Sequence, residues 1–486
     1  MESKLEQLLR ECEENYKTQP VFLYREEEEI RQISYARFWE DVQKRKAYYR
    51  SLPVRRIGLW AYNSYSWIVS AAAMLSAGKT VILLDANLSD EELKGLCDYA
   101  DVEIVAADDE MAEEIGEIWL GKRKISVISM AQEKDADGNC VMTEDEDAEG
   151  EFLCFTSGTS KSAKGVVIPA ATLCGCVRHY EELVKGEPGQ KFYLPLPYYH
   201  IYAFLYIFHI LYFGGVQCIG QMGRYLQKDL ELMQPEVMFC VPSILRYLLE
   251  KDYFPSWLQK VLTGGSYLRP ELAAAVEKQG IELYNLYGSS EVLGAIGYST
   301  EEKGTGWICP VKGSRFFQNE SGELGVQLPY HMKEYYRKPE DTLEVLDAEH
   351  HVFWTGDAGE VDEDGLALIR GRVRDMIVLE NGEKIHAEDT DEKLCALSGV
   401  KDAAVIAVDG VLTAVLVPEE GRQRADFERE LKRMNRNRPS AIRIQNIWIY
   451  EEDLPRTTTG KLRRFVLEQK YAKECVRDSA RSGEDT

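Results

Sequence analysis

Apolar and polar residues alternate along the first part of the chain in blocks that predict strands and helices in turn. Val54–Tyr62 has the pattern of a buried strand, Ser66–Ala77 is an Ala-rich helical segment, and Thr80–Leu84 is a second apolar strand. A helical pattern over 91–100 and an apolar run over 102–106 continue the alternation. Strands that alternate with helices favour a parallel sheet whose faces the helices cover.

A second stretch of the same kind spans about 194–287, with short strands at 236–241 and 283–287 and a helix at 243–251 between them. After Gly322 the pattern changes to short apolar runs separated by turn residues.

Beyond about Arg372 the pattern is typical of a small α+β unit, with helices at 387–397 and 424–435 and strands at 403–408 and 412–417. We therefore predict an α/β protein with two domains. A large N-terminal domain, 1–371, contains parallel-type sheets and helices, and a small mobile C-terminal α+β domain spans 372–486.

Composition narrows the class of protein. The chain has 486 residues, 45% of them hydrophobic, which is enough apolar material for folded cores. Lys and Arg number 58 against 82 Asp and Glu, a net charge of -24, which argues against nucleic acid as a partner.

Location follows from the cysteines and the apolar runs. The 11 cysteines are scattered, and the first 17 residues lack the apolar core of a secretory signal, so we expect a reducing cytoplasm. The longest apolar runs, Trp67–Gly78 and Leu205–Gly215, are shorter than the roughly 20 residues that cross a bilayer. We predict two buried helices there and no transmembrane segment.

The run Phe152–Ile168, FLCFTSGTSKSAKGVVI, is the most informative local pattern. It places hydroxyls, a glycine and two lysines in a short loop between two apolar strands. Backbone N–H groups, hydroxyls and ammonium groups in such a loop can surround phosphate oxygens. Taken alone, the run fits a phosphate loop or an ordinary polar hairpin loop.

Five further segments follow in a fixed order: LTGGS at 262–266, NLYGSSE at 285–291, WTGD at 354–357, GRVRD at 371–375 and LPRTTTGKLR at 454–463. Together with the loop, this set resembles the acyl-adenylate-forming (AMP-binding) enzyme superfamily, which includes acyl-CoA synthetases, carrier-protein-loading adenylation domains and firefly luciferase. The six elements cover almost the whole chain, which makes the resemblance specific.

The resemblance implies an ATP site built from many segments. Phosphates would contact the loop, the glycine segments would admit the base, and Tyr287 would stack on it. Asp357 would bind the ribose, and Arg372 would donate to the same sugar or to phosphate. The implied ATP-binding residues are Thr156, Ser157, Gly158, Thr159, Ser160, Lys164, Gly264, Gly265, Ser266, Asn285, Leu286, Tyr287, Gly288, Ser289, Ser290, Asp357 and Arg372. The alternatives for these positions are turn glycines, a core tyrosine, a structural turn aspartate and a salt-bridge arginine.

The implied catalytic residues are Lys461, Glu291 and His200. Glu291 is a hard oxygen ligand suited to Mg²⁺, and Lys461 is a cation able to bring the α-phosphate and a carboxylate together. His200, in LPLPYYHIYAF, would lie at the acyl site, although a hydrogen-bonded core histidine fits the segment as well. Arg374 would be the hinge, and Gly382 would lie beside an incoming thiol.

The chain departs from the family pattern at several positions. Lys161 and Ala163 stand in the phosphate loop where the family usually has a glycine and a proline, Ser290 replaces the usual threonine, and the hinge residue is Arg374. The effect of Lys161 and Ala163 on phosphate binding stays open.

The predicted function is ATP-dependent activation of a carboxylic acid to acyl-AMP, with pyrophosphate release, and transfer to a thiol, most simply CoA. Apolar and small residues at 292–296 favour a fatty or aryl acid over an amino acid. Expected cofactors are ATP and Mg²⁺, with CoA as co-substrate. Two alternatives remain: an enzyme that loads an acyl or amino acid onto a carrier protein, and a catalytically silent nucleotide- or acyl-binding protein.

Overall fold

The structure, a computed structural model of the chain, divides into two compact units, which we describe separately. The first comprises the described residues within Met1–Thr156, Ser162–Arg315 and Gln327–Phe353, and the second comprises those within Phe316–Val326 and Trp354–Thr486. The structure describes residues 2–115, 117–120, 123–130, 149–156, 164–179, 186–220, 225–300, 304–373, 376–378, 384–408, 411–419, 421–422, 424–436, 438, 443–456 and 462–472.

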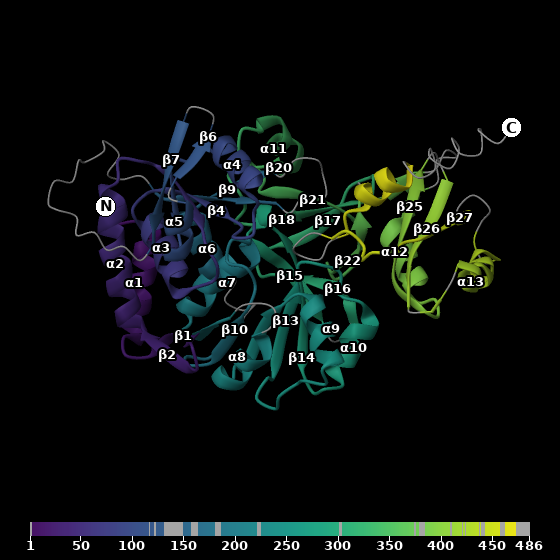
Figure 1. Cartoon of the computed structure of the whole chain (residues 1–486), viewed down its shortest axis with the longest axis horizontal. Coiled ribbons are helices and arrows are strands. Elements are labelled where there is room, and N and C mark those ends of the chain that lie inside the picture. The colour runs from purple at the N-terminus through teal and green to yellow at the C-terminus, as the bar shows by residue number, and fades with distance from the viewer. Residues whose placement is uncertain are drawn as a thin grey trace. The chain divides into compact units, whose positions relative to one another are not determined.

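One sheet of the first unit has a parallel centre with antiparallel edges (Figure 1). Its order is β19-β9-β8-β4-β3-β5-β7-β6, and the strands from β8 to β7 run parallel. The bounds are β3 Arg56–Trp60, β4 Thr80–Leu84, β5 Ile104–Ala107, β6 Glu117–Leu120, β7 Arg123–Ser129, β8 Glu151–Phe155, β9 Gly165–Pro169 and β19 Glu334–Tyr335.

The other sheet of this unit follows the same plan. In the order β16-β15-β14-β13-β12-β10-β11-β1-β2, the strands from β14 to β1 are parallel. The bounds are β1 Pro20–Glu26, β2 Glu29–Ser34, β10 Lys191–Leu194, β11 Val216–Ile219, β12 Val237–Cys240, β13 Lys260–Gly264, β14 Glu282–Ser289, β15 Gly294–Thr300 and β16 Gly304–Pro310; a short strand β20, Leu346–Asp347, pairs with the start of β21, Val352–Val361.

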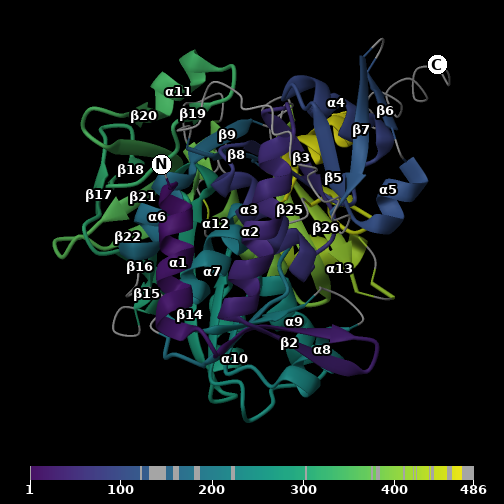
Figure 2. The same ribbon diagram turned by 90° about the vertical axis from the view of Figure 1, so that its left-hand side faces the viewer.

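Helices pack against both sheets, and Figure 2 shows α1, α2 and α3 side by side. Helices α3 and α6 contact β4 and β9 of one sheet, whereas α7 contacts β11 and β15 of the other, and α6 packs on α7. The bounds are α1 Lys4–Tyr16, α2 Tyr35–Ser51, α3 Tyr65–Ser76, α4 Asp90–Tyr99, α5 Asp109–Ile115, α6 Ala170–His179, α7 Ile201–Tyr212, α8 Leu226–Met233, α9 Pro242–Glu250, α10 Pro270–Glu277 and α11 Pro339–Val345.

Local sequence explains the two most buried helices. In α3 the Ser64 hydroxyl accepts a hydrogen bond from the Trp67 N–H at 3.1 Å, which caps the helix, and Gly78 takes a φ of +76° just after its end. Helix α7 is apolar around almost its whole circumference, as expected of a helix covered on all sides. The predicted buried helices are confirmed as α3 and α7. None of the helices in the described ranges is long and apolar enough to cross a membrane.

The second unit has two parts. Strands β17 Arg315–Gln318, β18 Glu323–Gln327, β21 and β22 Ala367–Arg372 lie in this order in one sheet. A separate three-stranded sheet, β25-β26-β27, carries α12 and α13, and the predicted strands and helices of this region are confirmed. The bounds are β23 Met376–Val378, β24 Lys384–His386, α12 Ala387–Cys395, β25 Val400–Val408, β26 Val411–Pro418, α13 Arg424–Arg436 and β27 Asn446–Ile449, with a last helix at 464–472.

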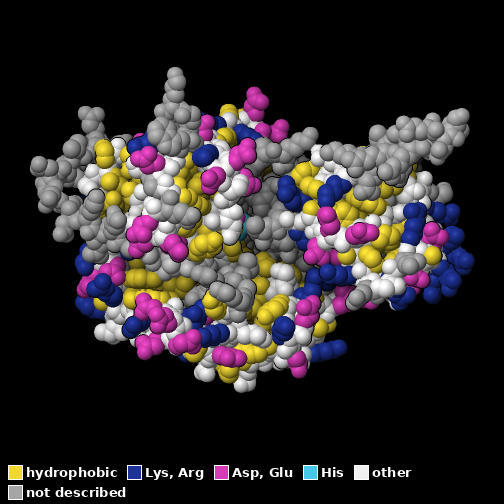
Figure 3. All heavy atoms as spheres, viewed as in Figure 1, with side chains coloured by type: hydrophobic (Ala, Val, Ile, Leu, Met, Phe, Trp, Pro, Cys, Tyr) yellow, Lys and Arg dark blue, Asp and Glu magenta, His cyan; other side chains and the backbone are white. Residues whose placement is uncertain are grey.

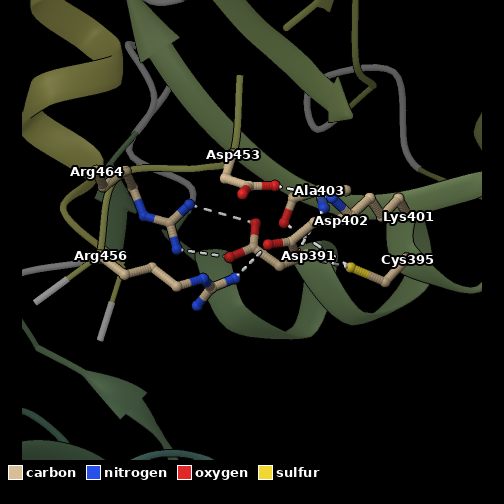
Figure 4. Close-up of polar contacts among 8 residues, drawn as sticks. All are labelled: Asp391, Cys395, Lys401, Asp402, Ala403, Asp453, Arg456 and Arg464. Carbon is tan, nitrogen blue, oxygen red and sulfur yellow. Dashed lines mark hydrogen bonds and ion pairs between the residues drawn. The ribbon is translucent and has the colours of Figure 1, made fainter. Parts of the chain in front are cut away.

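Two ion pairs join the segment that follows β27, residues 450–456 and 462–472, to α12 and β25 (Figure 4). Arg464 contacts the Asp391 carboxylate at 2.7 Å, and Arg456 contacts Asp402 at 2.7 Å. Burial raises the pKa of Asp391, and the Arg464 guanidinium opposes that rise. Because Arg456 and Leu462 form a β-bridge, both ends of the segment around 457–461 are held on this unit.

Removal of Arg464 would leave the buried Asp391 carboxylate without its main counter-charge. We expect Arg464→Ala to destabilise the protein by about 3–5 kcal/mol at neutral pH, the usual cost of breaking a buried pair from one side. Since the folded variant favours protonated Asp391, its stability should fall as the pH rises through the raised pKa of Asp391. Thermal unfolding at pH 5 and pH 8 measures this. The double variant Asp391→Asn/Arg464→Ala is the control and should lose that pH dependence; an equal dependence in both variants would contradict the account.

Candidate functional site

The predicted site residues lie in both units. Thr156, Lys164, His200 and the segments at 264–266 and 285–291 belong to the first unit. Asp357 and Arg372 belong to the second unit. Several predicted residues fall outside the described ranges, so their roles stay predictions: Ser157, Gly158, Thr159, Ser160, Lys161, Ala163, Arg374, Gly382 and Lys461.

The two ends of the predicted phosphate loop are held together by a β-hairpin. Strands β8 and β9 pair antiparallel as far as Phe155 and Gly165. Beyond them, the Thr156 N–H donates to the Lys164 carbonyl at 3.0 Å, and the Lys164 N–H donates to the Thr156 hydroxyl at 3.3 Å. We call the hydrogen-bonded pair Thr156 and Lys164 the neck of the loop, because the loop begins at one and ends at the other. The neck lies at the carboxyl end of a parallel strand, where α/β sheets commonly bind ligands.

The Lys164 side chain contacts two other side chains. Its ammonium pairs with Asp341 at 2.8 Å and lies 4.5 Å from the ring centroid of Tyr335. Both partners come from a segment about 170 residues further along the chain, and nothing in the local pattern around Lys164 indicated them. Lys164 is thus placed beside the loop neck with its charge balanced.

Glycines stand where the carboxyl ends of β13 and β14 pack closely against neighbouring strands. A Cβ on Gly264 would lie 2.9 Å from the Leu286 carbonyl oxygen, and one on Gly288 would lie 1.4 Å from the Gly294 carbonyl oxygen. Gly265 has a φ of +80° and is exposed, and Ser266 follows it half-buried. Gly264 and Gly288 are therefore required by packing between neighbouring strands, and the predicted approach of this backbone to a base stays a prediction.

Side chains at the end of β14, and just after it, differ in how far they are buried. Tyr287, Ser289 and Ser290 are half-buried, whereas Leu286 is buried at 6% exposure, so Leu286 can meet a nucleotide only through its backbone. The Asn285 N–H donates to the Ser299 hydroxyl at 3.0 Å. A half-buried ring at Tyr287 has the exposure that stacking on a base requires.

Glu291 lies in a short 3-10 turn, Ser290–Val292, directly after β14. The Tyr335 hydroxyl donates to Glu291 Oε1 at 2.7 Å, and the Met332 N–H donates to the Glu291 carbonyl at 2.6 Å. A carboxylate has two oxygens, so Glu291 can accept from Tyr335 and still ligate a cation.

This donor set fits Mg²⁺ bound through phosphates. Mg²⁺ usually takes one or two carboxylates together with phosphate oxygens and water. Within the described ranges, no three His, Cys, Asp or Glu side chains gather as a metal site. A cation bound here by the described residues would therefore depend on the nucleotide for most of its ligands.

Cys154 lies on β8 beside this turn, yet it cannot serve as a nucleophile at neutral pH. Burial raises the pKa of Cys154 to about 12, and the nearby charge of Glu291 adds to the rise. The thiol therefore stays protonated.

His200 precedes α7, at the point where the strand order of the second sheet reverses. After β10 the chain returns through α7 to β11 on one side, whereas β12 lies on the other. Asn63 fixes the segment before His200, since its amide donates to the Leu196 carbonyl at 2.8 Å and accepts from the Tyr198 N–H at 3.0 Å. The half-buried His200 ring lies 4.5 Å from the ring of Tyr199. Such reversal points form crevices that bind ligands.

In the second unit, Asp357 and Arg372 are directly opposite each other on β21 and β22. Arg372 Nε pairs with Asp357 Oδ1 at 2.8 Å, and the same guanidinium donates to the Thr355 carbonyl at 3.0 Å. The Asp357 N–H donates to the Thr355 hydroxyl at 3.0 Å. The two residues predicted to contact the nucleotide are thus brought together.

Because Gly288 has no room for a side chain, Gly288→Ala should break the β14–β15 contact and the edge that carries Glu291. We expect strong destabilisation, about 3 kcal/mol or more, in line with severe overpacking and lost pairing. Gly95→Ala is the control: Gly95 lies exposed in α4, and no atom lies within 4 Å of the point that an added Cβ would occupy, so it should gain about 0.5–1 kcal/mol. Urea unfolding compares the two, and equal stability would contradict the packing described.

Comparison with known proteins identifies similar proteins over most of the chain. The family model described as "AMP-binding enzyme" matches residues 9–336, and the model described as "AMP-binding enzyme C-terminal domain" matches 374–477. The long-chain-fatty-acid–CoA ligase FadD13 of Mycobacterium tuberculosis is 24% identical over 66% of this chain and 67% of its own length. The 2-succinylbenzoate–CoA ligase of Bacillus cereus is 24% identical over 85% of this chain and 88% of its own length.

Solved structures show the same fold. The o-succinylbenzoate CoA synthetase of Bacillus subtilis, in complex with its acyl-adenylate intermediate, superposes with a TM-score of 0.81 at 18% identity, over 95% of this chain and 97% of that one. The same synthetase is also known with ATP and a magnesium ion. The predicted fold class and the resemblance are confirmed, and the chain belongs to the AMP-binding enzyme family.

Proposed function

We propose that the protein is an AMP-forming acid–thiol ligase, which activates a carboxylic acid with ATP, releases pyrophosphate and transfers the acyl group to CoA. The observation that carries this is the arrangement at the end of β8 and β14. There the neck of the phosphate loop, the Lys164 ammonium and the Glu291 carboxylate are joined through one side chain, Tyr335. This arrangement occurs in a chain of the AMP-binding enzyme family.

The first half-reaction requires two anions to meet. A carboxylate oxygen attacks the α-phosphorus, and pyrophosphate leaves, so positioning and charge balance must supply most of the catalysis. Lys164 and the loop would bind phosphate oxygens, and Lys461 would bridge the α-phosphate and the acid. Mg²⁺ at Glu291 would neutralise phosphate charge when bound.

Each unit contains residues that we propose to recognise the nucleotide. Gly265, which is exposed and has only Val241 within 4 Å of the place of its missing side chain, would admit a base, and Tyr287 would stack on it. Asp357 would accept hydrogen bonds from the ribose hydroxyls, with Arg372 holding the carboxylate in place.

The acid we propose is fatty or aryl. The residues that follow Glu291 are apolar and buried: Val292, Leu293, Ala295 and Ile296 are at most 2% exposed. The two relatives named above act on acids of different kinds, a long-chain fatty acid and 2-succinylbenzoate, so they support a CoA ligase without fixing the acid. His200, at the reversal point of the sheet, would lie at the acyl site.

The second half-reaction would use the C-terminal domain. We propose a mobile domain from 372 onward, a hinge at Arg374 and a thiol path beside Gly382. None of the nine described cysteines forms a disulfide bond with another, which supports the reducing cytoplasm that we propose as the protein's location.

A carrier protein is the second candidate acceptor, and α13 favours it. Figure 3 shows Lys and Arg side chains gathered at the edge of the molecule where Figure 1 labels α13. The exposed basic residues on and beside this helix are Arg422, Arg424, Arg429, Lys432, Arg433, Arg436 and Arg443. A local basic surface on a chain of net charge -24 can attract an acidic partner that the whole protein would repel.

The main experiment measures pyrophosphate release with MgATP across fatty, aryl and amino acids, with and without CoA. We expect release with an apolar acid, consumption of CoA, and a loss of about 10²–10³-fold in rate for Lys461→Ala, as for removal of one charge-stabilising donor. Pyrophosphate release without CoA consumption would favour the carrier protein. ATP binding without release for any acid would indicate the catalytically silent alternative and contradict the proposal.

A charge-reversal experiment separates the two acceptors. If an acidic carrier protein docks on α13, Lys432→Glu/Arg433→Glu should lower kcat/KM for the carrier about 10-fold or more at low salt and leave CoA turnover unchanged. Lys44→Glu/Lys278→Glu, at two exposed positions of the first unit, carries the same charge change and is the control. An equal effect of both pairs, or none, would count against docking on α13.

A further inference from the structure

The segment 332–336 connects the neck of the phosphate loop to the turn that holds Glu291. On one side its backbone pairs with β9: the Lys333 N–H donates to the Val167 carbonyl at 2.8 Å and the Tyr336 N–H to the Gly165 carbonyl at 2.7 Å. On the other side the Met332 N–H donates to the Glu291 carbonyl at 2.6 Å. The segment therefore spans the two features that the proposed function brings to the phosphates.

Tyr335 lies at the centre of this segment and makes both side-chain contacts. Its hydroxyl donates to Glu291 Oε1 at 2.7 Å, and its ring centroid lies 4.5 Å from Lys164 Nζ. The residue is 4% exposed. One buried side chain thus contacts the proposed metal ligand with its polar end and the loop lysine with its face.

The backbone of Tyr335 is itself fixed. It is paired with Val166 of β9, and its N–H donates to the Thr342 hydroxyl at 2.9 Å. That hydroxyl donates in turn to the Lys338 carbonyl at 2.9 Å, which ties the start of α11 to the segment. Because the backbone is held from both sides, the ring and hydroxyl have little freedom.

Each contact restricts a charged group without neutralising it. A hydrogen bond to one carboxylate oxygen selects one orientation of Glu291 and leaves the other oxygen for a cation, as outer-sphere partners of metal ligands do. A ring face attracts an ammonium group but takes none of its hydrogen-bonding capacity for oxygen acceptors. Lys164 also pairs with Asp341 at 2.8 Å, but an ammonium group has three N–H donors, so it keeps donors for phosphate oxygens.

We propose that Tyr335 is a positioning residue of the adenylation half-reaction, which orients Glu291 through its hydroxyl and Lys164 through its ring. The proposal rests on the proposed function. It assigns Tyr335 no contact with the substrates: Tyr335 sets the directions from which metal and phosphate are bound. Removal of the hydroxyl should then weaken the part of nucleotide binding that depends on Mg²⁺. Removal of the ring should also weaken the part of nucleotide binding that does not depend on Mg²⁺.

The neighbouring Tyr336 supplies a matched control. Its hydroxyl donates to Asp101 at 2.9 Å, away from both Glu291 and Lys164. Tyr336→Phe deletes the same atom one residue further along and should leave nucleotide binding unchanged.

The experiment measures binding of α,β-methylene-ATP to the full-length protein by calorimetry over a range of Mg²⁺ concentrations. We expect Tyr335→Phe to raise the Mg²⁺ concentration for half-maximal binding about 10-fold, at the lower end of the effect of an outer-sphere partner, with affinity restored at saturating Mg²⁺. Tyr335→Leu, which also loses the ring, should stay weaker even at saturating Mg²⁺. Melting temperatures of all variants show whether any has lost its fold.

Two results would overturn the proposal: the same Mg²⁺ dependence in Tyr335→Phe and Tyr336→Phe, or an equal loss of binding at every Mg²⁺ concentration together with a lowered melting temperature.

The assay of acid-dependent pyrophosphate release is run on the wild-type protein alongside the binding measurements. No release, with Tyr335-dependent Mg²⁺ binding intact, would contradict the proposed function while the role of Tyr335 in binding stands. Release with the Mg²⁺ dependence unmoved would contradict the role of Tyr335 alone.

Discussion

Repulsion between anions is the constraint on which this protein's site depends. A carboxylate must reach a phosphate, and the chain that brings them together has a net charge of -24. Fixed cations and backbone donors have to offset that repulsion locally. Lys164 is held at the neck of the phosphate loop, between the Asp341 carboxylate and the Tyr335 ring, before any substrate arrives. The cost of placing the charge is thus met in folding, and little reorganisation is left for the reaction.

The fold places these groups through the ends of parallel strands. Strands β8, β13 and β14 stop at the neck, at Gly264 and just before Glu291, and each belongs to the parallel part of its sheet or adjoins it. Helices cover the faces, so the strand ends are where polar chemistry can be presented. Glycine is required where the Gly288 backbone approaches the Gly294 carbonyl, because any side chain there would collide with it.

Much of this could be predicted from the sequence. The apolar pattern of Ser66–Ala77 indicated the helix seen at Tyr65–Ser76, because a continuous buried helix depends on its own residues. The loop and motif order identified the family. Asp357 and Arg372 were each predicted to contact the nucleotide, but their pairing with each other across β21 and β22 was not predicted. Tyr335 and Asp341 were not found. Their contacts with Lys164 arise from the pairing of β19 with β9, far apart in the chain, and no local pattern records that pairing.

The central claim is that the acid's own oxygen attacks the α-phosphorus of ATP. The most direct test supplies an acid labelled with ¹⁸O in its carboxylate, together with MgATP and CoA, and follows the label by mass spectrometry. Attack at the α-phosphorus followed by thiolysis leaves the bridging oxygen on the nucleotide, so the account predicts AMP carrying one ¹⁸O. Label in inorganic phosphate together with ADP, or AMP without label, would contradict it.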